Sequence, residues 1–197
     1  MTVKLIPKYK PAPLNQSPEH FILTQIAVVM LKENFKCKWA GNEVYLPPGK
    51  RATGGPHHKY VADAVGIKRN TNDYTIRCIE AKVSLSDFRA GFCRTADYAH
   101  IIAPKGLLTP DMLPAGMGLV EVDFNELRRG RKYLHGVEVV RKAVKARAEA
   151  LPADRQAWVD RVMREICAGY TNERVYRNEW FYNDERYARR GRRGKGE

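Results

Sequence analysis

The apolar positions near the N-terminus follow a helical pattern. Over residues 17–35, SPEHFILTQIAVVMLKENF, Ser17 is a favourable N-cap and Pro18 takes the first helical position, where proline is tolerated. The apolar residues of this segment cover most of the helix circumference: Phe21, Ile22, Ile26, Val29 and Met30. The pattern therefore predicts a first helix that is largely buried.

Short runs typical of β-strands follow this helix. Residues 35–48 predict a first strand or a hairpin, and NTND at 70–73 predicts a tight turn. Five further runs have strand-like alternation or apolar content: 60–67, 74–83, 98–104, 116–123 and 135–144.

Two further helices are predicted between and after these strands. Ser84 and Ser86 are alternative N-caps of a short helix between the second and third of the five runs. The apolar residues along one side of that helix are Leu85, Phe88 and Phe92. A last helix is predicted around residues 152–170, where apolar residues recur at four-residue steps: Trp158, Val162 and Ile166. Helices and strands in this order, without an internal repeat, predict a mixed α/β layer.

The length of 197 residues and the apolar fraction of 44% predict one domain with extensions. We expect an N-terminal extension over 1–16, the domain over 17–150, a helical extension over 151–186 and a basic, disordered tail over 187–197. No apolar run approaches the length of a membrane span, and the early prolines and lysines argue against a signal peptide.

The cysteines are widely spaced, without the clustering of a zinc site. They are Cys37, Cys78, Cys93 and Cys167. We therefore expect reduced thiols, which are typical of a cytosolic protein.

The net charge of the chain is the composition feature that most restricts the possible function. Thirty-five Lys and Arg residues against 22 Asp and Glu give a net charge of +13, which favours a polyanion, most commonly nucleic acid. The alternative is a solubilising surface with a basic tail, because part of the excess lies in RYARRGRRGKGE at residues 186–197.

Three charged side chains lie in runs where apolar residues are expected. Asp63 interrupts the apolar run 60–67, although aspartate is a poor strand former. Glu80 and Lys82 are two residues apart and therefore share one face of their strand. If the two strands pair as a hairpin, Asp63 and Glu80 meet at the same end of the sheet. The alternative is an ordinary ion pair at a strand end.

Two converging carboxylates repel each other unless one is protonated or a cation lies between them. Oxygen ligands suit Mg²⁺ or Mn²⁺, so Asp63 and Glu80 are the predicted metal ligands. Such a cation polarises a phosphoryl oxygen, while Lys82 positions the attacking water or stabilises negative charge at phosphorus. The three residues together provide what phosphodiester hydrolysis requires.

Asp63 on one strand, followed by Glu80-Ala81-Lys82 on the next, resembles the PD-(D/E)XK nuclease motif. That superfamily has an αβββαβ core, so the resemblance implies a restriction-endonuclease-like α/β fold with a central mixed sheet flanked by helices. The surrounding sequence is similar to that of the MmcB family of DNA-repair-associated proteins. The segments that carry this similarity are EAKVSLSDF, DYAHIIAP, DMLPAGMGLVEVD and the later VVRKA. This resemblance covers residues 17–146.

Two acidic residues compete for a further position in this site. The resemblance implies an assisting acid from the first helix, which matches Glu19, although the helix dipole also favours a carboxylate there. Glu43, on the predicted first strand, is the rival. Ser84 and Asp87 belong to the family-like segment, and capping of the following helix accounts for both.

Basic and aromatic residues elsewhere suit contacts with nucleic acid. Side chains that suit phosphate lie in the loop 49–59 and in a cluster after residue 127: Lys50, Arg51, His57, His58, Lys59, Arg128, Arg129, Arg131 and Lys132. Aromatic residues that suit base stacking, or docking onto the domain or a partner, interleave with arginine near the C-terminus: Tyr176, Trp180, Phe181, Tyr182 and Tyr187. The alternative for each basic cluster is a solvated face.

The triplet and the resemblance together predict a metal-dependent DNA endonuclease that uses Mg²⁺ or Mn²⁺ in DNA repair, recombination or phage DNA processing. A non-catalytic DNA-binding repair-accessory protein on the same fold is the alternative, and an RNA-binding protein that relies on the basic tail is a third. The expected partner is DNA and not a membrane, and a homodimer stays open. The expected location is the cytoplasm of a bacterium or of the bacterial host of a phage.

Overall fold

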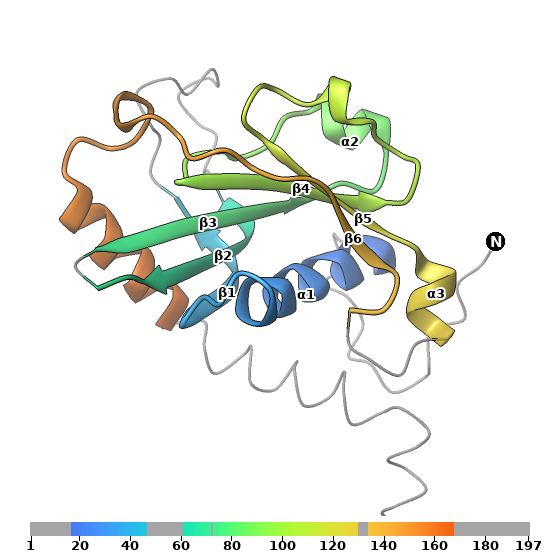
Figure 1. Ribbon diagram of the computed structural model, residues 1–197, viewed down its shortest axis with the longest axis horizontal. Coiled ribbons are helices and arrows are strands. Elements are labelled where there is room, and N and C mark those ends of the chain that lie inside the picture. Colours follow the sequence, from blue (N-terminus) through green and yellow to red (C-terminus); the bar gives the residue numbers. More distant parts are fainter. Residues whose placement is uncertain (1–16, 47–60, 72, 130–133, 168–197) are drawn as a thin grey trace, which may run out of the picture.

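The computed structural model describes residues 17–46, 61–71, 73–129 and 134–167. These residues build one mixed sheet of six strands in the order β1-β2-β3-β4-β5-β6 (Figure 1). The strands are β1 (Trp39–Tyr45), β2 (Val61–Arg69), β3 (Tyr74–Ala81), β4 (Tyr98–Pro104), β5 (Gly118–Val122) and β6 (Val137–Arg141). The α/β class predicted from the sequence is confirmed.

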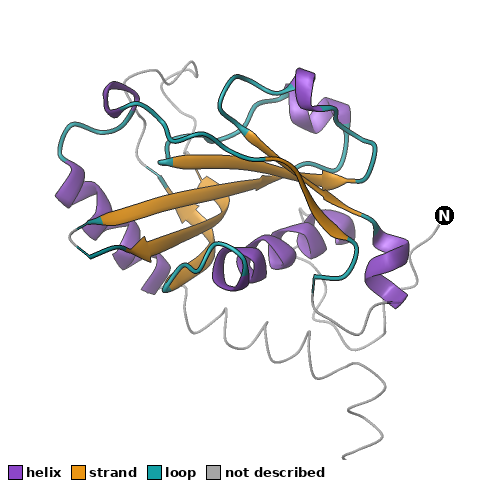
Figure 2. Cartoon of the chain, in the orientation of Figure 1, coloured by secondary structure: helices purple, strands orange, loops and turns teal. Residues whose placement is uncertain are grey.

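Helices flank this sheet (Figure 2). They are α1 (Pro18–Glu33), α2 (Leu85–Arg89) and α3 (Phe124–Arg129), with 3₁₀ turns at Pro110–Met112 and Ala148–Ala150 and a further helical stretch over residues 155–167. The order α1, β1, β2, β3, α2, β4 is the predicted αβββαβ sequence of elements. Among the helices that the structure describes, none is long and apolar enough to cross a membrane.

The sheet changes its strand direction at β3. Strands β1, β2 and β3 form an antiparallel meander, β3, β4 and β5 are parallel, and β6 returns antiparallel to β5. A parallel neighbour needs a crossover connection, and residues 82–97, which contain α2, provide it between β3 and β4.

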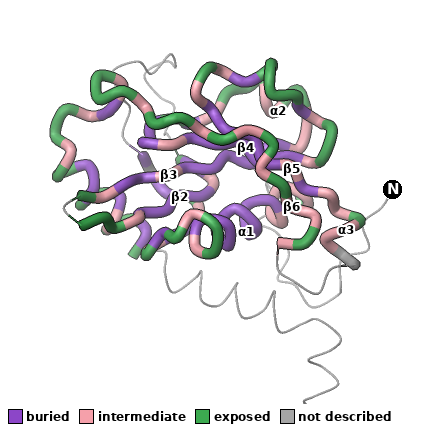
Figure 3. Tube along the Cα trace, viewed as in Figure 1, coloured by how far each residue is buried: buried purple, intermediate pink, exposed green. Residues whose placement is uncertain are grey.

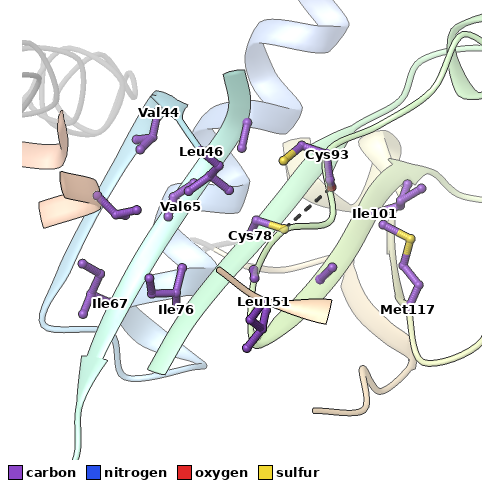
Figure 4. Close-up of a cluster of buried hydrophobic side chains, with 14 of the residues drawn as sticks. Val44, Leu46, Val65, Ile67, Ile76, Cys78, Cys93, Ile101, Met117 and Leu151 are labelled. Carbon is purple, nitrogen blue, oxygen red and sulfur yellow. Dashed lines mark hydrogen bonds between the residues drawn. The ribbon is translucent and has the colours of Figure 1, made fainter. Parts of the chain in front are cut away.

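Alternating side chains give the sheet two buried faces, and most residues of the central strands β3 and β4 are buried (Figure 3). Ala64 and Ile79 belong to the core cluster on the side of α1. Val65 and Cys78, each one residue away, belong to the opposite cluster (Figure 4). The helical stretch 155–167 contributes Trp158, Val159, Val162 and Ile166 to this cluster. The sheet is therefore enclosed between two hydrophobic layers.

The start of α1 is as predicted. Ser17 is the N-cap and its side chain accepts a hydrogen bond from the backbone nitrogen of His20 at 3.2 Å, while Pro18 opens the helix. Every residue from Leu23 to Leu31 is buried, which agrees with the apolar circumference.

Three local features refine the sequence predictions. Of the two forms predicted for residues 35–48, the described residues contain the single strand, β1. The short helix α2 is capped by Ser84 and ends at Arg89, so Phe92 lies beyond it and stacks on Phe88 at 5.4 Å between ring centroids. Helix α3 is not predicted, since six largely polar residues carry no clear apolar period.

The segment after residue 150 packs directly on the domain. Its buried apolar residues are Leu151, Trp158, Val159, Val162 and Ile166. Asp97, only 1% exposed, anchors this segment: its Oδ2 accepts hydrogen bonds from Arg155 at 2.9 Å and from the backbone nitrogen of Ile76 at 2.7 Å. Arg155 also donates to the carbonyl of Tyr74 at 2.5 Å. These contacts of Arg155 and Asp97, here called the clamp, join the last described helix to the first residues of β3.

Replacing Arg155 by methionine should lower the free energy of unfolding by about 2–3 kcal/mol, because Asp97 then keeps a buried charge without its cation. Chemical denaturation measures the change. The matched control is Arg164→Met, an exposed position on the same helical stretch, which should stay within about 0.5 kcal/mol of the parent. Equal losses of unfolding free energy in the two variants would show that the clamp makes no specific contribution to stability.

Candidate active site

The pairing of β2 with β3 brings the predicted carboxylates together. Ala64 pairs with Ile79, so the next position along this antiparallel register sets Asp63 beside Glu80. Oδ2 of Asp63 accepts a hydrogen bond from the backbone nitrogen of Ala81 at 2.8 Å, which fixes its carboxylate at the end of β3. The hairpin predicted from the sequence is confirmed, and so is the meeting of these two residues.

Within the described part of the chain, Glu80 is buried with one of its two oxygens unpartnered. It is 5% exposed, and its Oε1 has no hydrogen-bond partner among the described residues. Burial, reinforced by the negative charge of Asp63, raises the pKa of Glu80 to about 8, although Lys82 and the backbone N–H groups of Asp63 and Cys93 act in the opposite direction. Burial therefore favours the protonated form of this glutamate unless a cation compensates its charge.

Lys82 follows the last residue of β3 and is 6% exposed. Its backbone nitrogen donates to the carbonyl of Ile102 at 2.9 Å, which extends the parallel ladder by one bond. Its ammonium Nζ donates to the carbonyl of Gly91 at 2.7 Å and to Oδ1 of Asp87 at 3.2 Å. The crossover between β3 and β4 thus holds this side chain at the site.

His20 joins the group from the first turn of α1. Its Nε2 lies 3.4 Å from Oδ2 of Asp63, and its Nδ1 is buried without a partner among the described residues. The hydrogen bond to Asp63 raises the pKa of His20 above its usual value, against the opposing effect of burial. The sequence analysis does not identify His20. The available signal is its position three and four residues before the buried Leu23 and Thr24, on the inward side of α1.

The two candidates for a further acidic residue remain predictions. Glu19 is partly exposed and, among the residues that the structure describes, makes no hydrogen bond or ion pair with this group. Glu43 is exposed on β1, between Asn42 and Val44, which pair with the neighbours of Asp63. Its φ of 52° lies in the left-handed region, where a glutamate is uncommon.

Most of the predicted phosphate contacts lie outside the described residues. These are Lys50, Arg51, His57, His58, Lys59, Arg131 and Lys132. Arg128 and Arg129 belong to α3, but their side chains are also outside the described part. The aromatic residues after position 170 are outside it as well.

The buried thiols of Cys78 and Cys93 interact electrostatically with Glu80. All four cysteines are free, as predicted, and Cys78 donates a hydrogen bond to the carbonyl of Cys93 at 3.8 Å (Figure 4). Burial raises the pKa of the Cys78 thiol and raises that of Cys93 to about 12. Both thiols therefore stay protonated at neutral pH, which makes them poor metal ligands and leaves the oxygen atoms as donors.

The donor set fits a hard divalent cation that keeps most of its water. Within the described ranges, no group of three or more His, Cys, Asp or Glu side chains is arranged to hold a metal ion. Asp63 and Glu80 are two carboxylates, and Mg²⁺ is commonly bound through one or two carboxylates with water completing its shell. The unpartnered Oε1 of Glu80 is the observation that fits such an ion.

Fold and site together define an α/β protein with a mixed six-stranded sheet and a pair of adjoining carboxylates, one deeply buried, at the end of its third strand. No protein-family model matches the chain, and no curated protein matches it. Among solved structures it is similar to the SPO1766 protein of unknown function from Silicibacter pomeroyi, with a TM-score of 0.50 and 18% identity over 82% of this chain and 91% of that chain. This similarity concerns the fold alone.

Glu80→Gln should stabilise the metal-free protein, increasingly as pH rises. Between about pH 5 and pH 8 the folded state keeps a proton that the unfolded glutamate has lost, so the parent loses roughly 1.4 kcal/mol of stability per pH unit relative to the glutamine variant. Denaturation at several pH values in EDTA measures this difference.

Glu138→Gln, at an exposed position on β6, is the control for removing a carboxylate and should show a pH-independent difference. Parallel stability curves for the parent and Glu80→Gln across this window would contradict the raised pKa.

Proposed function

We propose that this protein is a metal-dependent DNA endonuclease that hydrolyses phosphodiester bonds, on a site of the PD-(D/E)XK type. The observation that carries the proposal is the buried carboxylate of Glu80, which has an unpartnered oxygen and lies beside Asp63 and next to Lys82. A buried acid in this state does not serve stability, since an apolar or amide side chain would fill the same space without the penalty. A bound cation would account for a carboxylate at this buried position.

The chain's own residues divide the work. Asp63 and Glu80 would hold the cation, and His20 and the backbone nitrogen of Ala81 fix the Asp63 carboxylate through hydrogen bonds to Oδ2. A bound Mg²⁺ or Mn²⁺ supplies positive charge to the phosphoryl oxygens and makes a nearby water more acidic. Lys82 orients the attacking water or stabilises the negative charge that develops at phosphorus.

The substrate class follows from charge. A net charge of +13 favours a polyanion, and phosphate contacts supply most of the affinity of proteins for DNA. The proposal includes a cytoplasmic setting in a bacterium or in the bacterial host of a phage, with a role in DNA repair, recombination or phage DNA processing. A homodimer is compatible with it.

A second candidate is a DNA-binding repair-accessory protein that does not cleave. It is favoured by the two hydrogen bonds of the Lys82 ammonium to Asp87 and Gly91, which give the lysine a structural role of its own. Plasmid, single-stranded and branched DNA incubated with Mg²⁺, Mn²⁺ or EDTA separate the two candidates.

Asp63→Ala and Lys82→Ala should each abolish Mg²⁺-dependent cleavage, a loss of at least about 1,000-fold, because the ligand or the electrostatic partner of the phosphate is gone. DNA affinity in gel-shift assays should change little, since distributed phosphate contacts dominate binding. Glu138→Ala, far along the sheet on β6, is the matched control and should cleave like the parent. Cleavage retained by carefully purified Asp63→Ala protein would sink the proposal.

Metal binding should also be visible without any substrate. Millimolar Mg²⁺ or Mn²⁺ should raise the melting temperature of the parent, because a ligand that binds only the folded state stabilises it. Asp63→Asn should remove this increase. An equal increase in both proteins would place the bound cation away from Asp63.

A further inference from the structure

Asp87 occupies the centre of a small network after β3. Its Oδ1 accepts from the Lys82 ammonium at 3.2 Å, and its Oδ2 accepts from the backbone nitrogen of Val83 at 3.2 Å. Its own backbone nitrogen donates to the N-cap hydroxyl of Ser84 at 3.1 Å. The cap therefore fixes the backbone of Asp87, and the carboxylate reaches back to the two residues that follow the strand.

A cap alone does not require this arrangement. Ser84 already satisfies the first turn of α2, and a carboxylate near a helix start gains its dipole interaction without contacting a lysine. Asp87 instead directs one oxygen to a nearly buried ammonium. A charge-assisted bond in such surroundings is stronger and more directional than one in water.

Gly91 completes the hold on Lys82 from the other side. Its carbonyl accepts from Nζ at 2.7 Å, and its φ of 109° is a backbone conformation that side-chain-bearing residues rarely adopt. An ammonium has three N–H bonds, of which Asp87 and Gly91 accept two. Among the residues that the structure describes, the third has no acceptor, which leaves it for a water or a phosphate oxygen at the site.

We infer that Asp87 is a positioning residue that holds the Lys82 ammonium so that its remaining N–H serves the reaction, with α2 acting as the support for this bond. The inference rests on the proposed cleavage activity for its functional part. Its structural part is the tether, by which we mean the hydrogen bond from the Lys82 ammonium to Oδ1 of Asp87. The bond from the backbone nitrogen of Val83 to Oδ2 holds the same carboxylate in place. Without the tether, the lysine retains its charge but loses its fixed direction.

The first test measures single-turnover cleavage of plasmid DNA with Mn²⁺. Asp87→Asn keeps the size of the side chain and removes its charge, and should slow cleavage by about 100-fold, the loss typical of a catalytic group displaced by about 1 Å. Its DNA affinity should match that of the parent. Asp87→Glu restores a carboxylate and should recover part of the rate, a rescue that a purely structural role does not require.

Asp154→Asn is the matched control, because it removes the charge of a carboxylate that accepts from the backbone nitrogen of Ala157 at 3.0 Å, near the end of β3 opposite Lys82. It should cleave at the parental rate. Equal cleavage by Asp87→Asn and the parent, or equal slowing by Asp154→Asn and Asp87→Asn, would overturn the positioning role.

The second test does not depend on cleavage. Acetylation of lysines by N-hydroxysuccinimide acetate, followed by mass spectrometry, should label Lys82 slowly in the parent and severalfold faster in Asp87→Asn. Unchanged labelling overturns the tether, whatever the cleavage data show. If the parent cleaves no DNA while labelling increases in the variant, the proposed function fails and the tether is upheld.

Discussion

The register between β2 and β3 is the constraint on which the rest of the structure depends. Because side chains alternate along a strand, this register places Ala64 and Ile79 under α1 and turns Val65 and Cys78 toward the last described helix. A slip of one residue in β3 would exchange its two faces and move Glu80 into the apolar layer below α1. The hydrophobic core therefore specifies the site: the same pairing that buries the aliphatic residues also sets the carboxylates side by side.

Stability and chemistry conflict at this point of the sheet. The burial that raises the pKa of Glu80 also keeps the thiols of Cys78 and Cys93 protonated, so the interior next to the site disfavours charge. Lys82 compensates the glutamate only in part, since its hydrogen bonds go to the crossover. A strained charge balance of this kind is common at functional sites and is maintained by the well-packed sheet around it.

Much of the fold and the centre of the site could be predicted from the sequence. Alternation and apolar runs locate the strands, and the out-of-place Asp63, Glu80 and Lys82 stand out because charges in an apolar strand need a reason. The position of His20 three and four residues before buried residues indicates only that it faces inward, because its contact with Asp63 depends on how the helix packs on the sheet. Glu19, its neighbour, has the more suggestive chemistry but points about 100° away around the helix. Asp87 was explained by capping alone, since a sequence does not show that one carboxylate serves both a cap and a lysine.

The parallel pairing of β3 with β4 has a consequence for how such a protein changes over time. The chain must leave the end of β3 and return to the start of β4, so a connection such as the segment 82–97 is required, and it begins at Lys82. Changes within the middle of this connection can alter the surroundings of Lys82 while the pairing of β3 with β4 is kept. Proteins that share this architecture can therefore differ at this end of β3 through one short connection, without a change in the fold.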